Sequence, residues 1–367
     1  MNNKDRIIFY IYTPAQAYTW RFIIQELIDK GFTVKILARD YGSTVNILLE
    51  NGFDVSSFKP FAQNYARIFE IFAHLKNGWK VSKEFNPNIV IGFGVLVAIT
   101  AKLINKPSIV FTDSEPIPFQ NMITKLFASI IIAPSSYRVN LGNKLIRIAS
   151  YKELAYLLPK YFKPDPSIFD DLGLAKNEKY ILLRFNVFDA VHDIGRHGFT
   201  EKDQFRLVNE LEKYAKVFIS PEGNLSKDLE KYKLLIHPNK IHQVLYYAQL
   251  IVTDTQTMTT EAAILGTPAV RCNNFVGPKD MGVFIELEKK YNIIYSFQKS
   301  DLAIQKAIEL IKLPDLKEQW AKKQEKLILD KIDFTQFMVN IIEGYPNSIK
   351  KFKKKVNDFE NSISNRS

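Results

Sequence analysis

Short runs of β-branched and aromatic residues alternate with longer amphipathic segments along this chain, and this alternation constrains its fold more than any other feature. Twelve such runs lie at residues 7–12, 33–38, 55–58, 89–93, 108–112, 130–133, 180–185, 217–220, 234–237, 250–253, 269–271 and 293–295. Strands that alternate with helices favour parallel sheets with helices on both faces. The pattern therefore predicts an α/β protein built from doubly wound, Rossmann-like sheets.

The alternation is interrupted once, at "LPKYFKPDPSIFDDLG", where three prolines and Gly173 break any periodic element. A chain of 367 residues also exceeds what one hydrophobic core usually serves. We therefore predict a first Rossmann-like domain over residues 1–165 and a second over residues 166–312. A C-terminal helical segment over 313–345, helical across 316–342, and a basic tail over 346–367 complete the expected organisation. Two parallel sheets with facing carboxyl ends would leave a ligand cleft between the domains.

Composition limits the partners and the compartment. The net charge is +11, from 50 Lys and Arg against 39 Asp and Glu, which favours anionic partners. The chain has no helix-turn-helix, stacking or zinc motif, so we expect no nucleic-acid partner. Cys272, the lone cysteine, excludes an intrachain disulfide, and the uncharged run at 89–101 is too short to span a bilayer. We expect a cytoplasmic protein, with peripheral contact at the inner membrane face left open.

The segment "VTDTQTMTTEAAILGTPAV" (252–270) places hydroxyl and amide residues where a strand passes into a helix. Free amides in the first turn of a helix and the helix dipole attract anions. Thr255, Thr257 and Thr259 add hydroxyl donors that suit a diphosphate, and Glu261 lies one turn further on, where it could accept hydrogen bonds from a ribose diol. The alternative interpretation is that the threonines only cap the helix.

A longer segment around it, "HQVLYYAQLIVTDTQTMTTEAAILGTPAVR" (242–271), resembles the nucleotide-sugar motif of the non-hydrolysing nucleotide-sugar 2-epimerases and related GT-B glycosyltransferases. Most of the chain is similar to the prokaryotic family of domain of unknown function 354. The segments that carry this second resemblance are "TDSEP", "IAPSSY", "YKELAYLLPKYFKPD", "LLRFNVFDAVHDIGRHG" and "TMTTEAAILGTPAVR". The resemblance implies a GT-B-like fold and a nucleoside diphosphate sugar, UDP-linked, as donor substrate, with no other cofactor and no metal. It also implies that His242 caps a helix or contacts the nucleotide base.

Four further positions are candidates for chemistry. Asp113 and Glu115 follow a strand, and paired carboxylates can divide into a base and an orienting group; a metal site or a solvated turn is the alternative. Arg184 could bind phosphate through its planar guanidinium. His192, next to Asp193, could act as a general base or donate to the leaving diphosphate, and a structural loop histidine is the alternative.

In the first loop the family carries a histidine where this chain has Gln16, so a base from that loop is in doubt. Gln16 and Thr19 could still bind an acceptor hydroxyl.

The basic tail surrounds Phe352 with lysines, a pattern consistent with attraction to anionic lipid. The lysines are Lys350, Lys351, Lys353, Lys354 and Lys355. A solvated terminal helix is the alternative. Taken together, the sequence predicts a metal-independent glycosyltransferase that uses a nucleoside diphosphate sugar and an unknown glycan or lipid-linked acceptor. A nucleotide-sugar 2-epimerase and a non-catalytic nucleotide-sugar-binding protein remain the alternatives.

Overall fold

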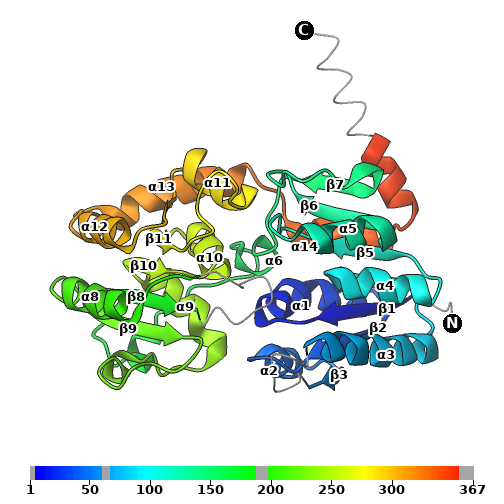
Figure 1. Cartoon of the computed structure of the whole chain (residues 1–367), viewed down its shortest axis with the longest axis horizontal. Coiled ribbons are helices and arrows are strands. Elements are labelled where there is room, and N and C mark those ends of the chain that lie inside the picture. The colour runs from blue at the N-terminus through cyan, green and yellow to red at the C-terminus, as the bar shows by residue number, and fades with distance from the viewer. Residues whose placement is uncertain (1–4, 60–66, 187–196, 355–367) are drawn as a thin grey trace, which may run out of the picture.

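A computed structural model describes residues 5–59, 67–186 and 197–354 of the chain. It contains two parallel sheets, of seven and five strands, covered by helices (Figure 1). The predicted α/β fold class with two doubly wound sheets is confirmed. Within the described residues no helix is long and apolar enough to cross a membrane.

The first sheet has the strand order β3-β2-β1-β4-β5-β6-β7. Its strands are β1 (Arg6–Ile11), β2 (Thr33–Arg39), β3 (Val55–Phe58), β4 (Ile89–Phe93), β5 (Ser108–Phe111), β6 (Ile130–Pro134) and β7 (Leu145–Ile148). Its helices are α1 (Pro14–Asp29), α2 (Thr44–Glu50), α3 (Arg67–Phe85), α4 (Val95–Leu103), α5 (Pro118–Phe127) and α6 (Leu154–Leu157). In the central part of this sheet, Ile7 of β1 pairs with Val34 of β2 on one side and with Ile89 of β4 on the other. Every residue of β4 is buried, as expected for a strand covered on both faces.

The second sheet has the order β12-β11-β10-β8-β9. Its strands are β8 (Tyr180–Phe185), β9 (Lys216–Pro221), β10 (Leu250–Thr253), β11 (Ala269–Cys272) and β12 (Ile294–Phe297). Its helices are α7 (Ile168–Asp171), α8 (Glu201–Leu211), α9 (Ile241–Tyr247), α10 (Thr257–Leu265), α11 (Gly282–Lys289) and α12 (Ser300–Ile311). Short 3-10 turns lie at η2 (Gly142–Lys144), η4 (Glu230–Tyr232) and η5 (Pro238–Lys240).

The strands of the structure differ from the predicted strands at two places. Residues 234–237 form no strand; only an isolated bridge joins Lys233 to Ile219, and Pro238 starts η5 directly afterwards. The apolar pattern there has another cause, because Leu234 and Ile236 line a cavity while Leu235 is 80% exposed. Conversely, β7 was not predicted, since it has only four residues and an exposed arginine, Arg147, interrupts them.

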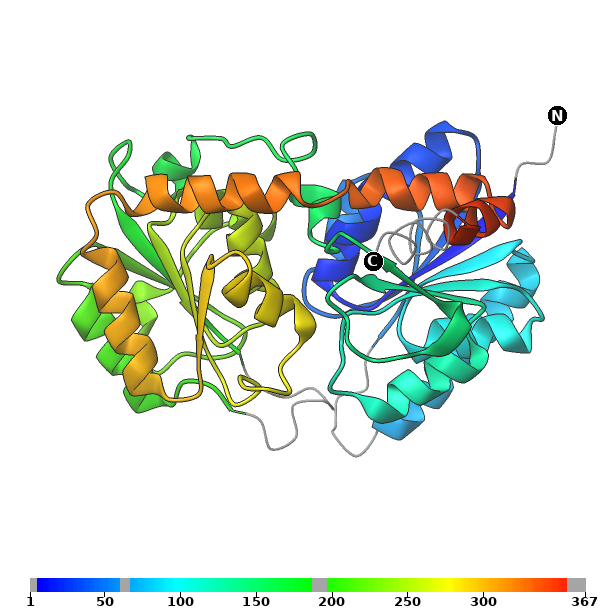
Figure 2. The same ribbon diagram turned by 90° about the horizontal axis from the view of Figure 1, so that it is seen from above.

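The predicted C-terminal helix is two helices, α13 (Leu316–Leu329) and α14 (Phe334–Glu343). Asp333 ends the break between them, because its side chain accepts from the Gln336 amide and so caps α14. α13 packs on α10, whereas α14 packs on α1, so this segment crosses from the second sheet back to the first (Figure 2). The aromatic ring of Phe334 joins the first core beside Trp20 and Phe111. The predicted domain limits remain predictions, although α14 belongs to the first core by its packing.

Candidate functional site: a cleft between the two sheets

A cavity of about 840 Å³ lies where the carboxyl ends of the two sheets face each other. Residues that follow strands of the first sheet line one side: Tyr12 after β1, Tyr41 after β2 and Val95 after β4. On the other side the lining residues are Asn186 after β8, Glu222 after β9 and Asp254 after β10. The chain leaves β8 toward β9 on one side and returns to β10 on the other, so Asn186 and Asp254 lie at the switch point of the second sheet. Open parallel sheets bind their ligands at such points.

The N-terminus of α10 opens into this cavity. Thr255, Gln256 and Thr257 line it directly, and Gln256, the N-cap residue, makes no side-chain capping bond. The capping interpretation of these residues therefore does not fit Gln256 and Thr257, which are half-buried beside the cavity. Uncapped amides at the start of a nine-residue helix offer a site to an anion.

The threonines around this turn differ in what their hydroxyls do. The Thr259 hydroxyl is fully buried and donates to the Thr255 carbonyl at 2.7 Å, so it points away from the cavity. The expected nucleotide contact of Thr259 stays a prediction, and its hydroxyl would have to leave the Thr255 carbonyl to make it. Thr255 is intermediate in its surroundings. Its hydroxyl is 2.7 Å from the Thr253 hydroxyl, but the residue also lines the cavity. Thr257 is the threonine that remains best placed for a ligand.

Glu261 lies at the floor of the cavity and joins the two halves of the protein. Its Oε1 accepts from the Tyr156 hydroxyl of α6 at 2.7 Å and lies 3.0 Å from His242 Nε2 of α9. Tyr18 of α1 packs edge-on against the His242 ring, with centroids 4.7 Å apart. The sequence predicts that Glu261 accepts hydrogen bonds from a ribose diol. The contacts with Tyr156 and His242 both use Oε1, so Oε2 is left for such a donor. His242 lines the cavity but is buried, and its Nε2 is engaged with the Glu261 carboxylate.

The electrostatic balance keeps Glu261 ionised. Burial raises the pKa of Glu261, but the charge of His242 and the hydrogen bonds from His242 and Tyr156 together outweigh it and lower the pKa below its ordinary value. A carboxylate held in this way can accept hydrogen bonds at neutral pH.

Arg184, the predicted phosphate ligand, lies at the end of β8 and lines the cavity. Its guanidinium donates to Glu222 Oε1 at 2.6 Å and to the Ser220 hydroxyl at 3.0 Å. The side chain is 20% exposed, so this pair is partly solvated. An incoming phosphate would have to compete with Glu222 for the guanidinium.

Asp254 lines the cavity but is not among the residues that the sequence pattern singled out. Its carboxylate accepts from the backbone amides of Asn186 at 2.7 Å and Phe199 at 3.3 Å. Burial, with a smaller contribution from the charge of Glu222, raises the pKa of Asp254 to about 7. A side chain at Gly198 would clash with this carboxylate. Gly198 was therefore the sequence signal for this contact, since a glycine at this position allows the loop to pack against Asp254.

Asp113 and Glu115, the predicted catalytic pair, lie outside the cavity lining, and their catalytic role stays a prediction. Asp113 forms an ion pair with Lys152, which also pairs with Glu153 at 2.8 Å. Glu115 Oε1 accepts from the amides of Gly282 at 2.9 Å and Arg138 at 3.2 Å. Burial raises the pKa of Glu115 despite these hydrogen bonds. Lys152 thus holds Asp113, and two backbone amides hold Oε1 of Glu115.

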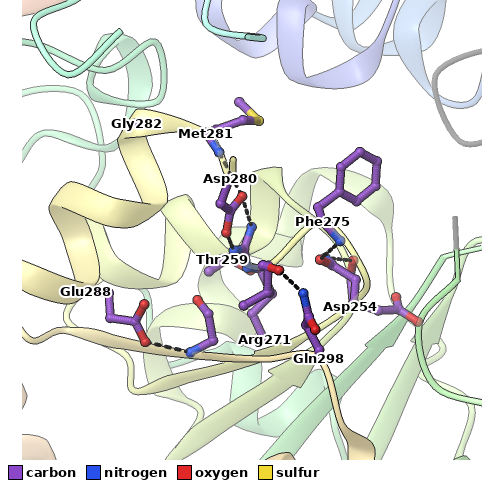
Figure 3. A network of polar contacts seen from close by, with 12 residues as sticks. Asp254, Thr259, Arg271, Phe275, Asp280, Met281, Gly282, Glu288 and Gln298 are labelled. Atoms are coloured by element: carbon purple, nitrogen blue, oxygen red, sulfur yellow. Dashed lines mark hydrogen bonds and ion pairs between the residues drawn. The ribbon is translucent and has the colours of Figure 1, made fainter. Parts of the chain in front are cut away.

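The contact that Glu115 makes is part of a junction between the two halves. Gly282 begins α11, so Glu115 lies at a helix N-terminus, where an anion is favoured. Arg138 donates to the Pro278 carbonyl at 2.9 Å and to the Asp280 carbonyl. Figure 3 shows Asp280 between Arg271 and the start of α11, where it forms a buried ion pair with Arg271. A Cβ at Gly282 would clash with the Ser136 carbonyl, so this close approach requires glycine.

The remaining predicted residues are placed as follows. Gln16 lies in the first turn of α1 and its Oε1 accepts from the Tyr12 amide at 2.8 Å, while the buried Thr19 hydroxyl donates to the Ala15 carbonyl at 2.8 Å. Neither side chain lines the cavity. His192 and Lys355 lie outside the described residues. Over the described residues, no group of three or more His, Cys, Asp or Glu side chains is arranged to hold a metal ion.

Comparison with known proteins places this architecture. The family described as protein of unknown function (DUF354) matches residues 11–344. No curated protein matches the chain. Solved structures do: S. aureus MnaA in complex with UDP has a TM-score of 0.69 at 14% identity, covering 94% of this chain and 98% of that one. The Neisseria meningitidis UDP-GlcNAc 2-epimerase bound to UDP-GlcNAc has a TM-score of 0.60 at 13% identity, covering 89% of this chain and 99% of that one. Acinetobacter baumannii MurG has a TM-score of 0.57 at 15% identity, covering 92% of this chain and 99% of that one. At these identities the likeness establishes the shared GT-B-like fold.

Proposed function

The chain belongs to the DUF354 family, and we propose that it binds a nucleoside diphosphate sugar in the cleft and transfers the sugar to an acceptor. One observation carries this proposal: the uncapped, hydroxyl-bearing N-terminus of α10 opens into an 840 Å³ cavity at the switch point of the second sheet. The cavity volume lies within the usual range for small-molecule sites. The donor would be UDP-linked, as the family resemblance implies.

The second half of the cleft would bind the nucleotide. The first-turn amides of α10 and the Thr257 hydroxyl would receive the diphosphate, and Glu261 would accept from the ribose hydroxyls through Oε2. Arg184 would leave Glu222 for a phosphate oxygen, because a phosphate offers a second charge to its planar fork.

Positive groups and helix amides can stabilise a departing diphosphate without a metal ion. α10 would supply the amides and Arg184 the charge, as negative charge develops on the leaving group. The pKa of Asp254, raised by burial to about 7, means that this neighbour can be protonated and hence uncharged when an anion occupies the site. His192 stays a predicted catalytic residue, and its replacement by alanine should lower turnover and spare binding.

The other half of the cleft would receive the acceptor. Tyr12, Tyr41, His74 and Gln120 line that side and supply hydroxyl, imidazole and amide groups. Such groups suit a polar, hydroxyl-bearing acceptor rather than a purely apolar one.

A ligand panel tests the proposal. Purified protein is mixed with nucleoside diphosphates and nucleotide sugars, and its unfolding temperature is recorded. A ligand at about 100 times its dissociation constant adds roughly 2.7 kcal/mol of stability. Glu261→Gln and Thr257→Val proteins serve as site controls. No shift with any member of the panel would overturn the proposal.

The two alternatives give different outcomes in the same preparation. A transferase leaves nucleotide sugars intact when no acceptor is present, apart from slow hydrolysis. A 2-epimerase interconverts C2 isomers without an acceptor, which chromatography of the sugar nucleotides detects. A binding protein shifts the unfolding temperature and turns nothing over, even with cell-extract acceptors.

A further inference from the structure

Helix α5 has the reverse of ordinary amphipathicity. Its exposed residues include Phe119, Met122 and Leu126, which are 67%, 59% and 66% exposed. Their spacing of three and four residues places them on one face of the helix. The buried residues of α5 are instead Asn121 and Thr124. A large apolar stripe that faces outward marks an interaction surface.

The inward polar residues explain why this orientation is fixed. Asn121 donates to the Glu115 carbonyl at 3.2 Å and accepts from the Tyr137 hydroxyl at 3.0 Å. Turning α5 to bury its apolar stripe would break these bonds and leave buried polar groups without partners. The outward direction of Phe119, Met122 and Leu126 is thus built into the fold.

The neighbouring helices continue the same surface. α4 packs between α3 and α5 on the face of the first sheet opposite to α1 and α14 (Figure 2). Three more large apolar side chains are exposed on α3 and α4: Phe72, Trp79 and Leu103. Trp79 and Leu103 line one shallow cavity of about 270 Å³, so the apolar groups of α3 and α4 meet.

This surface is also basic. The exposed lysines of the three helices are Lys76, Lys80, Lys83, Lys102 and Lys125. Among the described side chains of these helices, Glu84 is the one exposed carboxylate. We call the exposed side chains of α3, α4 and α5 the α3–α5 face.

The described end of the basic tail connects to the C-terminal end of α5 through η2. Lys144 of η2 donates to the carbonyls of Lys125 and Leu126 at 3.0 Å, and Lys353 donates to the neighbouring Asn143 carbonyl. Lys350, Lys351 and Lys354 of this segment are exposed. Phe352 instead packs edge-on against Phe337 at 5.3 Å, so it is not the apolar contact that the tail sequence indicated.

We propose that the α3–α5 face docks on an anionic lipid bilayer. The apolar stripe of α5 would enter the headgroup region, and the surrounding lysines would meet lipid phosphates, each contributing about 1 kcal/mol near the surface. A second copy of the chain is a poorer occupant, because it would bring lysine against lysine without carboxylates to pair them. Gln120 of α5 lines the cleft, so docking would bring the cleft mouth close to the membrane. The proposal stands independently of the nucleotide assignment.

Vesicle flotation tests it. The full chain is floated with phosphatidylcholine vesicles and with equimolar phosphatidylcholine and phosphatidylglycerol vesicles. We expect binding to the anionic vesicles that weakens with salt. A triple variant, Phe119→Ser with Met122→Ser and Leu126→Ser, should bind at least about tenfold more weakly, since it removes the inserted apolar area. Lys102→Gln and Lys125→Gln should each weaken binding about fivefold.

Leu329→Ser is the matched control, because Leu329 is 80% exposed but lies on α13. It should bind as the original chain does. Trp79 gives a second measurement without any variant. It is 38% exposed, whereas Trp20 and Trp320 are buried, so lipids with brominated acyl chains should quench Trp79 alone.

Three results would overturn the proposal. The first is equal or absent binding to both vesicle types. The second is unquenched tryptophan fluorescence on anionic vesicles, which decides the matter even if the triple variant does not fold. The third is a dimer in solution that the triple variant converts to a monomer, which would assign the α3–α5 face to a second copy.

Discussion

Two strand-to-helix turns carry carboxylates toward the junction of the two halves, and they serve different ends. The turn between β5 and α5 holds Asp113 and Glu115, and both are engaged by other protein groups: Lys152 for the first, and the amides of Gly282 and Arg138 for the second. The turn between β10 and α10 holds Asp254 and Thr257, which line the cavity.

The comparison extends to the helices that begin there. α11 starts against Glu115, so an anion of the protein itself occupies its N-terminus. α10 starts without a side-chain cap and opens into the cavity. The same physical site, a helix N-terminus facing the other half, is thus used once to join the halves and once, in our proposal, to bind a ligand.

The largest effect that we expect is a pH dependence that belongs to the α10 side. The pKa of Asp254 lies near 7 in the folded chain, against an ordinary value of 3.8. Between these values the folded chain holds a proton that the unfolded chain has lost, so stability falls as the pH rises, by up to about 1.4 kcal/mol per pH unit, and levels off above pH 7. Denaturant unfolding at pH 5, 6, 7 and 8 measures this.

Asp254→Asn supplies the control for that slope. Its amide group faces two backbone donors, so the variant should be less stable at every pH, but its slope between pH 5 and 7 should be flatter. Identical slopes for the two proteins would place the titration elsewhere.

The next effect concerns Glu261. Glu261→Gln should weaken the binding of a nucleoside diphosphate by about tenfold to a hundredfold, since charge-assisted hydrogen bonds are worth about 1.5–3 kcal/mol. The 2′,3′-dideoxy analogue should lose much less. Titration calorimetry with both ligands checks this, and Tyr156→Phe, which removes only the donor to Oε1, should lie between the variant and the original. Equal losses for the two ligands would refute the ribose assignment.

A smaller effect separates the β5–α5 turn from the cleft. Glu115→Gln removes the charge at the start of α11 and should lower the free energy of unfolding by about 1–2 kcal/mol. Nucleotide affinity and turnover should not change by more than about twofold, because Glu115 lies outside the cavity lining. A general base at this position would instead lose about a hundredfold or more in turnover. Such a loss would restore Glu115 to the chemistry.

The smallest effect distinguishes two threonines on one helix. Thr257→Val should weaken diphosphate binding by about 0.5–1.5 kcal/mol, because valine keeps the shape and loses the donor. Thr259→Val should leave affinity unchanged and slightly lower stability, since its hydroxyl serves the Thr255 carbonyl. The unchanged affinity of both variants would return this turn to a purely structural role.

The residues of the proposed nucleotide side were readable from the sequence because they follow one another in it. The strand at 250–253, the turn, and the helix up to Gly266 are local, so their pattern placed Thr257 near the start of a helix that follows a strand, and Glu261 one turn further on. Gly266 ends α10 in the left-handed conformation, with φ of 72°, which glycine adopts readily at the end of a helix.

The direction of a side chain was not readable. Thr259 and Thr257 share a helix and a residue type, and only the packing decides that the hydroxyl of Thr259 meets a carbonyl while Thr257 lines the cavity. Asp254 gains its raised pKa from burial under the loop around Gly198, and Tyr156 reaches Glu261 across 105 residues of sequence.

The sequence by itself determined the two parallel sheets, most of their strands, and the turn at 254–257, because hydrophobic periodicity and turn chemistry act over a few residues. Only the tertiary structure decided which groups hold Asp113 and Glu115, that residues 316–342 break into α13 and α14, and that α5 shows its apolar side. Each of these depends on a partner from a distant part of the chain: Lys152 and Gly282 for the carboxylates, the first core for α14, and Tyr137 for the orientation of α5. Such partners meet only once the chain is folded, and the charge or hydrogen bond that they supply fixes which side of a polar residue remains for function.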